Sequence, residues 1–181
     1  LTVGRRREHP VAGGIDVAIP AGAATAVTGP NGAGKSTFAL TLVGLLAPLA
    51  GRVDAAEQLA AGAGSSPSRW RSRQLVERIG TVFQDPEHQL VSATVTGESA
   101  FGAVDPGRVA ELRDAFDLRD WAYRSPDTLS GGQKRRLSLA AMLAHERPVL
   151  LADEPGFGLD RAATRAAMAA LRKAADGGPV V

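Results

Sequence analysis

The chain has 181 residues, with 21 Lys and Arg against 19 Asp and Glu, which gives a formal net charge of +2. This length suits one domain with a core of its own, and the apolar fraction of 44% excludes wholesale disorder. The sequence has no cysteine, which excludes disulfides and thiolate metal sites, and no apolar run approaches the roughly 18–20 residues of a membrane-spanning helix.

The first half of the chain predicts two strands and a helix. Residues 15–19 alternate between apolar and polar side chains, and residues 24–28 are a short apolar run typical of a buried strand. A glycine-rich loop follows, and the helical pattern then runs from about Ser36 to Leu46. Residues 54–68 are rich in Ala, Gly, Ser and Pro, so we expect a flexible surface loop there.

The second half continues the alternation of strands and helices. Apolar runs predict strands, and amphipathic stretches predict helices, in the following order: strand 79–83, helices 107–116 and 133–144, strand 148–152, helix 160–175, and the beginning of a strand at 179–181. This order predicts an α/β fold with a mainly parallel core sheet. We expect one domain, whose core comprises residues 1–85 and 146–181, with residues 86–145 as an inserted helical subdomain.

The strongest functional signal is the segment Gly29–Thr37, which fits the pattern G-x-x-x-x-G-K-[ST]. Its glycines let several backbone N–H groups point into one concavity, and the following helix adds its positive N-terminal dipole. Lys35 can then reach the β- and γ-phosphates of a nucleotide, and the Ser36 hydroxyl can ligate Mg²⁺. The alternative, a glycine-rich turn with a surface lysine, is disfavoured because a predicted strand and helix flank the loop.

A pair of acids follows the predicted strand at 148–152. Ligands of open α/β sheets bind outside the carboxyl ends of the strands, where Asp153 and Glu154 are expected. Asp153 would hold Mg²⁺, and Glu154 would polarise the attacking water as general base. Without a phosphate loop in the same chain, the alternative that both acids simply solvate a strand end would be equally favoured. The loop makes that alternative much less favoured.

The segment Leu129–Gln133 reads Leu-Ser-Gly-Gly-Gln and precedes an amphipathic helix. Physically it is a second anion nest at a helix N-terminus. Lys35, Gln84, Ser130 and Asp153 follow one another in the order and approximate spacing of a known family. Over nearly its whole length the chain resembles the nucleotide-binding domain of ABC transporters, which implies the P-loop NTPase fold.

This resemblance implies a role for each motif. The cofactors are ATP and Mg²⁺, and the catalytic residues are Glu154, Gln84 and Lys35. Ser36, Gln84 and Asp153 would hold the metal, and Gly158-Leu159-Asp160 resembles the D-loop. The phosphate-loop residues implied to contact ATP are Asn31, Gly32, Ala33, Gly34, Lys35, Ser36 and Thr37. The residues of the second motif, which would contact the ATP held by the other subunit, are Ser130, Gly131, Gly132 and Gln133.

Within the family, residues 82–90 resemble the energy-coupling factor importers of cobalt and vitamins, and residues 156–160 resemble tandem ATPases, some linked to thiamine precursors. The implied function is the ATP-hydrolysing motor subunit of a membrane transporter that imports a metal ion or a vitamin. The implied partners are a second ABC ATPase domain and a transmembrane subunit. The resemblance places the protein on the cytoplasmic face of the membrane, and we expect no nucleic acid partner.

The sequence also departs from the family pattern. Residues 1–14 contain no aromatic side chain that could stack on adenine, and only Arg5, Arg6, Arg7 and His9 offer planar groups. The family's switch histidine would lie beyond Val181, so we expect a C-terminally truncated domain that binds nucleotide better than it hydrolyses it. Two alternatives remain open: a soluble ABC-type ATPase that acts on nucleic acid or ribosomes, and a degenerate, non-hydrolysing partner domain.

Overall fold

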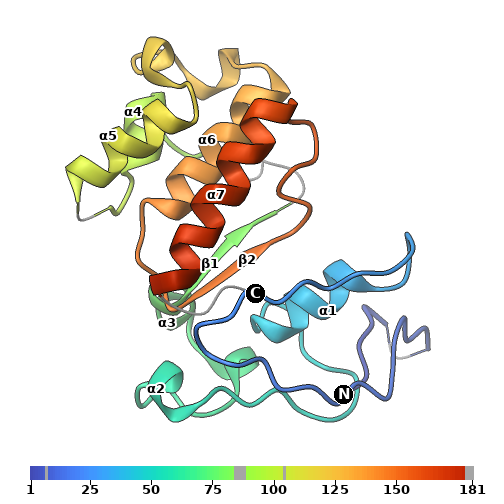
Figure 1. Cartoon of the computed structure of the whole chain (residues 1–181). Coiled ribbons are helices and arrows are strands. Elements are labelled where there is room, and N and C mark those ends of the chain that lie inside the picture. Colours follow the sequence, from blue (N-terminus) through green and yellow to red (C-terminus); the bar gives the residue numbers. More distant parts are fainter. Residues whose placement is uncertain (7, 84–88, 104, 178–181) are drawn as a thin grey trace.

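The computed structural model describes residues 1–6, 8–83, 89–103 and 105–177. In this part of the chain (Figure 1), two short strands lie at the centre with helices around them. The elements are α1 (Lys35–Leu42), α2 (Glu57–Ala60), α3 (Ser72–Arg78), β1 (Ile79–Val82), α4 (Val95–Ala100), α5 (Pro106–Ala115), α6 (Gly131–Leu143), β2 (Val149–Ala152) and α7 (Arg161–Gly177). Short 3-10 turns occur at Pro67–Arg69, Arg119–Trp121 and Pro126–Thr128.

Strands β1 and β2 pair in parallel, from Ile79 opposite Val149 to Val82 opposite Ala152. Parallel strands require a long crossover, and here the crossover carries α4, α5 and α6. A Cβ on Gly80 would lie 2.8 Å from Leu150 and 3.3 Å from Met142 of α6. Glycine at this position therefore allows helix α6 to pack closely on the sheet. The predicted parallel sheet is confirmed, with both strands within one residue of their expected bounds.

The core lies where α6 meets α4, α5, α7 and the sheet. Phe116, Leu118, Leu137 and Leu139 are all at most 1% exposed and share one cluster with Leu150. Helix α7 contributes apolar residues at intervals of four, with Ala167, Leu171 and Ala175 buried on one face. The predicted helices at 107–116, 133–144 and 160–175 correspond to α5, α6 and α7, because each has an apolar face to bury.

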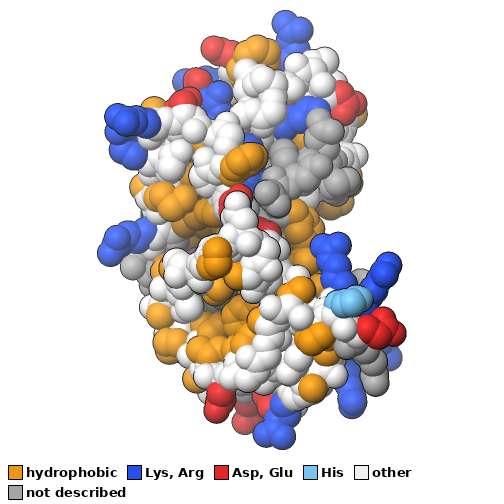
Figure 2. Space-filling model, turned by 90° about the vertical axis from the view of Figure 1, so that its right-hand side faces the viewer, with side chains coloured by type: hydrophobic (Ala, Val, Ile, Leu, Met, Phe, Trp, Pro, Cys, Tyr) orange, Lys and Arg blue, Asp and Glu red, His pale blue; other side chains and the backbone are white. Residues whose placement is uncertain are grey.

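The first predicted strands are not formed. Residues 15–19 and 24–28 make no continuous strand, and Val17 and Val27 stay 57% and 41% exposed. Segment 22–27 lines the same pocket as the end of β2, and the sheet of the described residues contains only β1 and β2. Figure 2 shows exposed apolar side chains across the middle of the molecule. The predicted strand at 179–181 lies outside the described residues.

One further expectation for the N-terminal half was wrong, and another was incomplete. The first helix ends at Leu42, not Leu46, because Gly44 adopts φ 78° and the N–H groups of Leu45 and Leu46 turn back to Leu40. The 54–68 segment lies mostly at the surface, as predicted, but it also has regular structure. It contains α2, and the indole N–H of buried Trp70 donates to the Gly64 carbonyl at 2.7 Å. This aromatic anchor gives the segment a packed conformation that its Ala, Gly and Ser content does not suggest.

We predict that His145 makes stability depend on pH. Its Nε2 donates to the Phe101 carbonyl at 2.9 Å. Burial, together with the nearby positive charge of Arg147, lowers the pKa of His145 below its ordinary value of about 6.5, although the Phe101 hydrogen bond opposes this. Because the pKa is lower in the folded state, the unfolded chain binds the proton more readily. Stability is therefore full above pH 6.5 and falls as the pH drops from 6.5 through the folded-state pKa.

Urea unfolding between pH 5 and 7.5 checks this. The wild type should lose stability toward pH 5, and His145→Gln, which keeps a donor for Phe101, should show a flatter profile over the same window. The exposed His9 provides the control, since His9→Gln should follow the wild-type profile. Identical slopes for the wild type and His145→Gln would contradict the prediction.

Candidate nucleotide site

The glycine-rich segment forms a phosphate loop in front of α1. Gly32 and Gly34 adopt φ values of 80° and 90°, which side chains other than glycine rarely adopt, and Gly34 is the N-cap residue of α1. The Lys35 Nζ folds back and donates to the carbonyl oxygens of Gly29 and Pro30, each at 3.0 Å. The ammonium group is therefore held over the loop by weak, exchangeable acceptors that a phosphate oxygen can replace.

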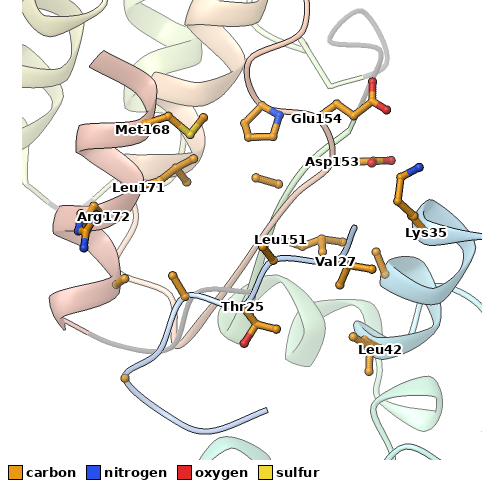
Figure 3. A pocket seen from close by; sticks show the side chains of 17 residues that line it. Thr25, Val27, Lys35, Leu42, Leu151, Asp153, Glu154, Met168, Leu171 and Arg172 are labelled. Carbon is orange, nitrogen blue, oxygen red and sulfur yellow. The ribbon is translucent and has the colours of Figure 1, made fainter. Parts of the chain in front are cut away.

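Acidic side chains lie across from this lysine. Asp153 and Glu154 follow β2 directly, and the Asp153 N–H donates to the Val82 carbonyl at 3.0 Å, which extends the strand pairing by one bond. Glu154 adopts φ 48°, in the left-handed region that favours glycine. Lys35, Asp153 and Glu154 line one pocket of about 770 Å³, and Figure 3 shows the lysine amine beside the Asp153 carboxylate. The structure thus brings together these three predicted residues.

The rest of this pocket is largely apolar. Its wall includes Leu151 of β2, Met168 and Leu171 of α7, and segment 22–27 (Figure 3). Of the other loop residues, Asn31, Gly32 and Ala33 are exposed, while Gly34, Ser36 and Thr37 are half-buried. The polar end of the pocket, near Lys35, is therefore the part suited to a phosphate chain.

Gln84 lies outside the described residues, but both flanks of its segment are described. The Phe83 N–H donates to the Oε1 of Gln89 at 3.1 Å, and the Nε2 of Gln89 donates to the Thr81 carbonyl at 2.5 Å. A side-chain amide thus pairs with the backbone of β1 as a neighbouring strand would. Sequence reasoning assigned no role to Gln89, although an amide just downstream of Gln84 was available as a signal.

The second predicted anion nest begins α6. The Ser130 hydroxyl accepts from the Gln133 N–H at 3.3 Å, and the Gln133 Oε1 accepts from the Ser130 N–H at 2.8 Å, which forms a capping box. Ser130 and Gly131 are exposed, and none of the residues from 130 to 133 lines the pocket with Lys35. The structure therefore does not bring this motif together with the chain's own phosphate loop.

The predicted D-loop touches this motif. A Cβ on Gly132 would lie 3.3 Å from the Gly158 carbonyl, so the two loops are close neighbours. Asp160 begins α7, where its Oδ1 accepts from the Ala163 N–H at 2.8 Å. That hydrogen bond is the main reason why the pKa of Asp160 is lowered, and the Ala162 N–H and nearby arginines act in the same direction while burial opposes them. Asp160 therefore acts here as a helix cap.

For the adenine-stacking position, the structure adds a residue that sequence reasoning missed. A Cβ on Gly34 would lie 2.8 Å from the Cγ2 of Val11, so this valine packs on the phosphate loop and is 44% exposed. His9 is exposed in an antiparallel bridge with Arg6. Arg5 is exposed too, and Arg7 lies outside the described residues. An apolar platform at Val11 accordingly lies beside the loop where no aromatic side chain is available.

The donor set fits Mg²⁺. The Ser36 hydroxyl and the Asp153 carboxylate are oxygen ligands of the kind that this ion prefers. A Cβ on Gly32 would meet nothing within 4 Å, so the loop backbone is open at that position. Among the described residues no three His, Cys, Asp or Glu side chains form a metal cluster.

Comparison with known proteins then identifies the family. The sequence model described as ABC transporter matches residues 12–156. The chain belongs to the ABC transporter family. This confirms the predicted resemblance, and the solved structures described below confirm the P-loop NTPase fold.

Three curated relatives are similar to this member of the family. A putative HMP/thiamine import ATP-binding protein of Bacillus subtilis is 40% identical over 150 residues, which are 81% of this chain and 26% of that protein. A cobalt import ATP-binding protein of Rhodobacter capsulatus is 41% identical over 158 residues, covering 83% and 55%. An energy-coupling factor transporter ATP-binding protein of Methanothermobacter thermautotrophicus is 38% identical over 159 residues, covering 83% and 50%. The chain thus spans about half of these relatives' length or less.

Solved ABC structures superpose on the chain. CbiO1 of Clostridium perfringens, part of the ABC transporter complex CbiONQ, has a TM-score of 0.73 at 32% identity, covering 98% of this chain and 72% of that one. A dimeric ATP-binding cassette in a post-hydrolysis state, bound to ADP and Pi, has a TM-score of 0.79 at 26% identity, covering 99% and 83%. In the described residues of this ABC domain, no helix has both the length and the apolar character to cross a membrane.

We predict that Lys35→Ala lowers ATP affinity by about 100-fold or more, because it removes a charge-assisted hydrogen bond to the phosphates as well as the charge itself. A fluorescent ATP analogue titrated into each variant measures this. Lys173→Ala, which removes an exposed lysine of α7, is the control and should bind as the wild type does. Equal affinity of Lys35→Ala and Lys173→Ala would contradict the role given to the loop.

Proposed function

We propose that the chain is the ATP-binding and hydrolysing domain of an ABC-type importer. The observation that carries this proposal is the single pocket lined by Lys35, Asp153 and Glu154. In this proposal Lys35 binds phosphate, Asp153 binds the metal and Glu154 is the base, and the three side chains meet at one edge of the sheet. Such a set is what hydrolysis of a nucleoside triphosphate requires.

ATP binding begins at the phosphate loop. The loop N–H groups and the N-terminal dipole of α1 receive the phosphates, and the Lys35 Nζ exchanges its two carbonyl partners for phosphate oxygens. Ser36 and Asp153 would hold Mg²⁺, together with Gln84, which lies outside the described residues. The metal, when bound, neutralises charge on the β- and γ-phosphates. Val11 offers an apolar contact near the loop.

Glu154 is the proposed general base. Its carboxylate accepts a proton from the attacking water as that water approaches the γ-phosphate in line. Lys35 and the loop N–H groups stabilise the negative charge on the transferring phosphoryl group, and they are in position before the reaction starts. The exposed carboxylate of Glu154 is accessible to such a water, and the φ of 48° turns its backbone sharply away from β2.

A second ABC domain completes the site. The exposed N-terminus of α6 at Ser130 and Gly131 does not line the chain's own pocket, so it is available to a nucleotide held by a partner domain. Two domains arranged head to tail then enclose ATP between the loop of one and Ser130–Gln133 of the other. ATP binding favours the closed dimer and hydrolysis releases it. The dimeric arrangement of the solved cassette supports this.

The transported substrate is proposed to be a metal ion or a vitamin. The support is the similarity to relatives described as cobalt and HMP/thiamine import proteins. A transmembrane subunit would recognise the substrate and would receive its contacts from the helical block at 86–145. The protein would then work at the cytoplasmic face of the membrane, and nothing in its charge favours nucleic acid instead.

Glu154→Gln should trap an ATP-bound dimer in the whole protein, because the amide keeps the shape of the side chain and cannot accept the proton. Size-exclusion chromatography with light scattering, in the presence of ATP and Mg²⁺, measures the dimer, and phosphate release measures turnover. Glu146→Gln, an exposed acid after α6, is the control and should behave as the wild type. Normal turnover by Glu154→Gln would remove Glu154 from the mechanism.

The importer assignment can be tested in cells. Deleting the gene should lower uptake of one member of a panel containing Co²⁺, Ni²⁺, thiamine precursors and biotin. Wild-type protein should restore that uptake and Glu154→Gln should not. Unchanged uptake of the whole panel would contradict the proposed substrate class. ATP hydrolysis stimulated by ribosomes or nucleic acid would favour the non-transport alternative.

A further inference from the structure

A buried arginine joins the two strand ends that carry the site. Arg135 lies one turn into α6 and is only 2% exposed. Its Nη1 donates to the Phe83 carbonyl, and its Nη2 donates to the carbonyls of Asp153 and Glu154, each at 2.7 Å. Phe83 follows β1 and the two acids follow β2. One guanidinium group therefore binds the backbone just past the end of both strands.

Such a burial is costly for a cation unless its surroundings compensate. Desolvation lowers the pKa of Arg135, whereas the negative charges of Asp153 and Glu154 oppose that effect. The carbonyls beyond the last strand pair have lost their ladder partners, and unpaired buried carbonyls are themselves unfavourable. The planar guanidinium satisfies several of them at once, which a lysine ammonium with its compact charge cannot do in the same geometry.

A second side chain of α6 reaches the same place. The buried Ser138, one turn beyond Arg135, donates from its hydroxyl to the Oε1 of Gln89 at 2.8 Å. That same oxygen accepts from the Phe83 N–H. Arg135 donates directly to the Phe83 carbonyl. Ser138 donates to the Gln89 amide oxygen, which in turn accepts from the Phe83 N–H. Helix α6 thus binds the carbonyl of Phe83, the residue before Gln84, directly and supports its N–H indirectly through Gln89.

These contacts orient the acid pair. The carbonyls of Asp153 and Glu154 point to Arg135, while their side chains line the pocket with Lys35 (Figure 3). Because each peptide unit is planar, fixing a carbonyl fixes the plane from which the neighbouring side chains project. Glu154 also has an unfavourable φ of 48°, so surrounding contacts must maintain its conformation.

We propose that Arg135 is a positioning residue for ATP hydrolysis, acting through the backbone of Asp153 and Glu154. The inference rests on the proposed function.

The test is steady-state hydrolysis by the whole protein carrying Arg135→Lys. Lysine keeps the charge but cannot bind all three carbonyls, so kcat should fall roughly 10- to 100-fold, the cost of a misplacement of about 1 Å, while KM for ATP changes less than about threefold. Arg136→Lys is the matched control. Arg136 is the next residue of α6, and its guanidinium contacts Phe116 and Asp117 instead of the strand ends. It should keep the wild-type kcat.

A double-mutant cycle separates positioning from a general loss of structure. If Arg135 acts through Glu154, Arg135→Lys should have little further effect on the residual kcat of Glu154→Gln. Additive effects would overturn the proposal. Should Arg135→Lys fold poorly, Arg135→Gln leaves no buried charge and should show the same loss of kcat with near-normal ATP binding.

The outcomes distinguish the inference from the function on which it rests. A wild-type protein that binds no ATP, or binds but does not hydrolyse it with its partners, overturns the proposed function and this inference with it. A hydrolysing wild type whose Arg135→Lys variant has unchanged kcat, or a lowered melting temperature with no change in kcat, overturns the inference alone. Selective loss of kcat supports both.

Discussion

The site depends on the parallel pairing of β1 with β2. Because the strands run in the same direction and stop together at Val82 and Ala152, the segments that leave them emerge at one edge of the sheet. One segment begins with Phe83 and leads toward Gln84, and the other begins with Asp153 and Glu154. The phosphate loop lies across the pocket from these acids. Residues from three distant parts of the sequence meet there because the pairing sets a common end point.

Helix α6 maintains that end point from the other side. Its apolar face joins the main core, its N-terminal turn exposes Ser130 and Gly131, and its first buried turn sends Arg135 to the strand ends. Helix α6 thus contacts the core of the domain along its length and exposes its N-terminus to a partner domain. Gly132 also lies close to the Gly158 carbonyl, so the second motif contacts the predicted D-loop. Both loops are expected at a dimer interface.

Much of this arrangement could be predicted from the sequence, for identifiable reasons. The strands at 79–82 and 149–152 are apolar runs bounded by polar residues, and the phosphate loop has a pattern that few other structures require. The segment at 15–28 has an equally strand-like pattern, but propensity does not specify a neighbour with which to pair. The early end of α1 depends on Gly44, and the packed 54–68 segment on Trp70, so both are consequences of tertiary contacts.

Two of the residues that sequence reasoning missed are polar side chains turned away from solvent, since Arg135 is buried and Gln89 is half-buried. Arg135 and Gln89 occur in helical or loop sequence where a polar residue normally faces solvent, and nothing local indicates that they reach strand ends instead. Their partners are backbone groups, which carry no sequence signature. The chemistry-bearing side chains of a site can thus be recognised from motifs, whereas the residues that position them become visible only in the fold.

The most direct measurement is a crystal structure of the whole protein with Mg²⁺ and a non-hydrolysable ATP analogue. The account predicts phosphates in the loop at Gly29–Thr37, Lys35 Nζ on phosphate oxygens, Mg²⁺ held by Ser36 and Asp153, and Glu154 facing the γ-phosphate. Ser130 and Gly131 of a second domain should cap the same nucleotide. A nucleotide bound away from Lys35, or a metal held by residues other than these, would contradict it.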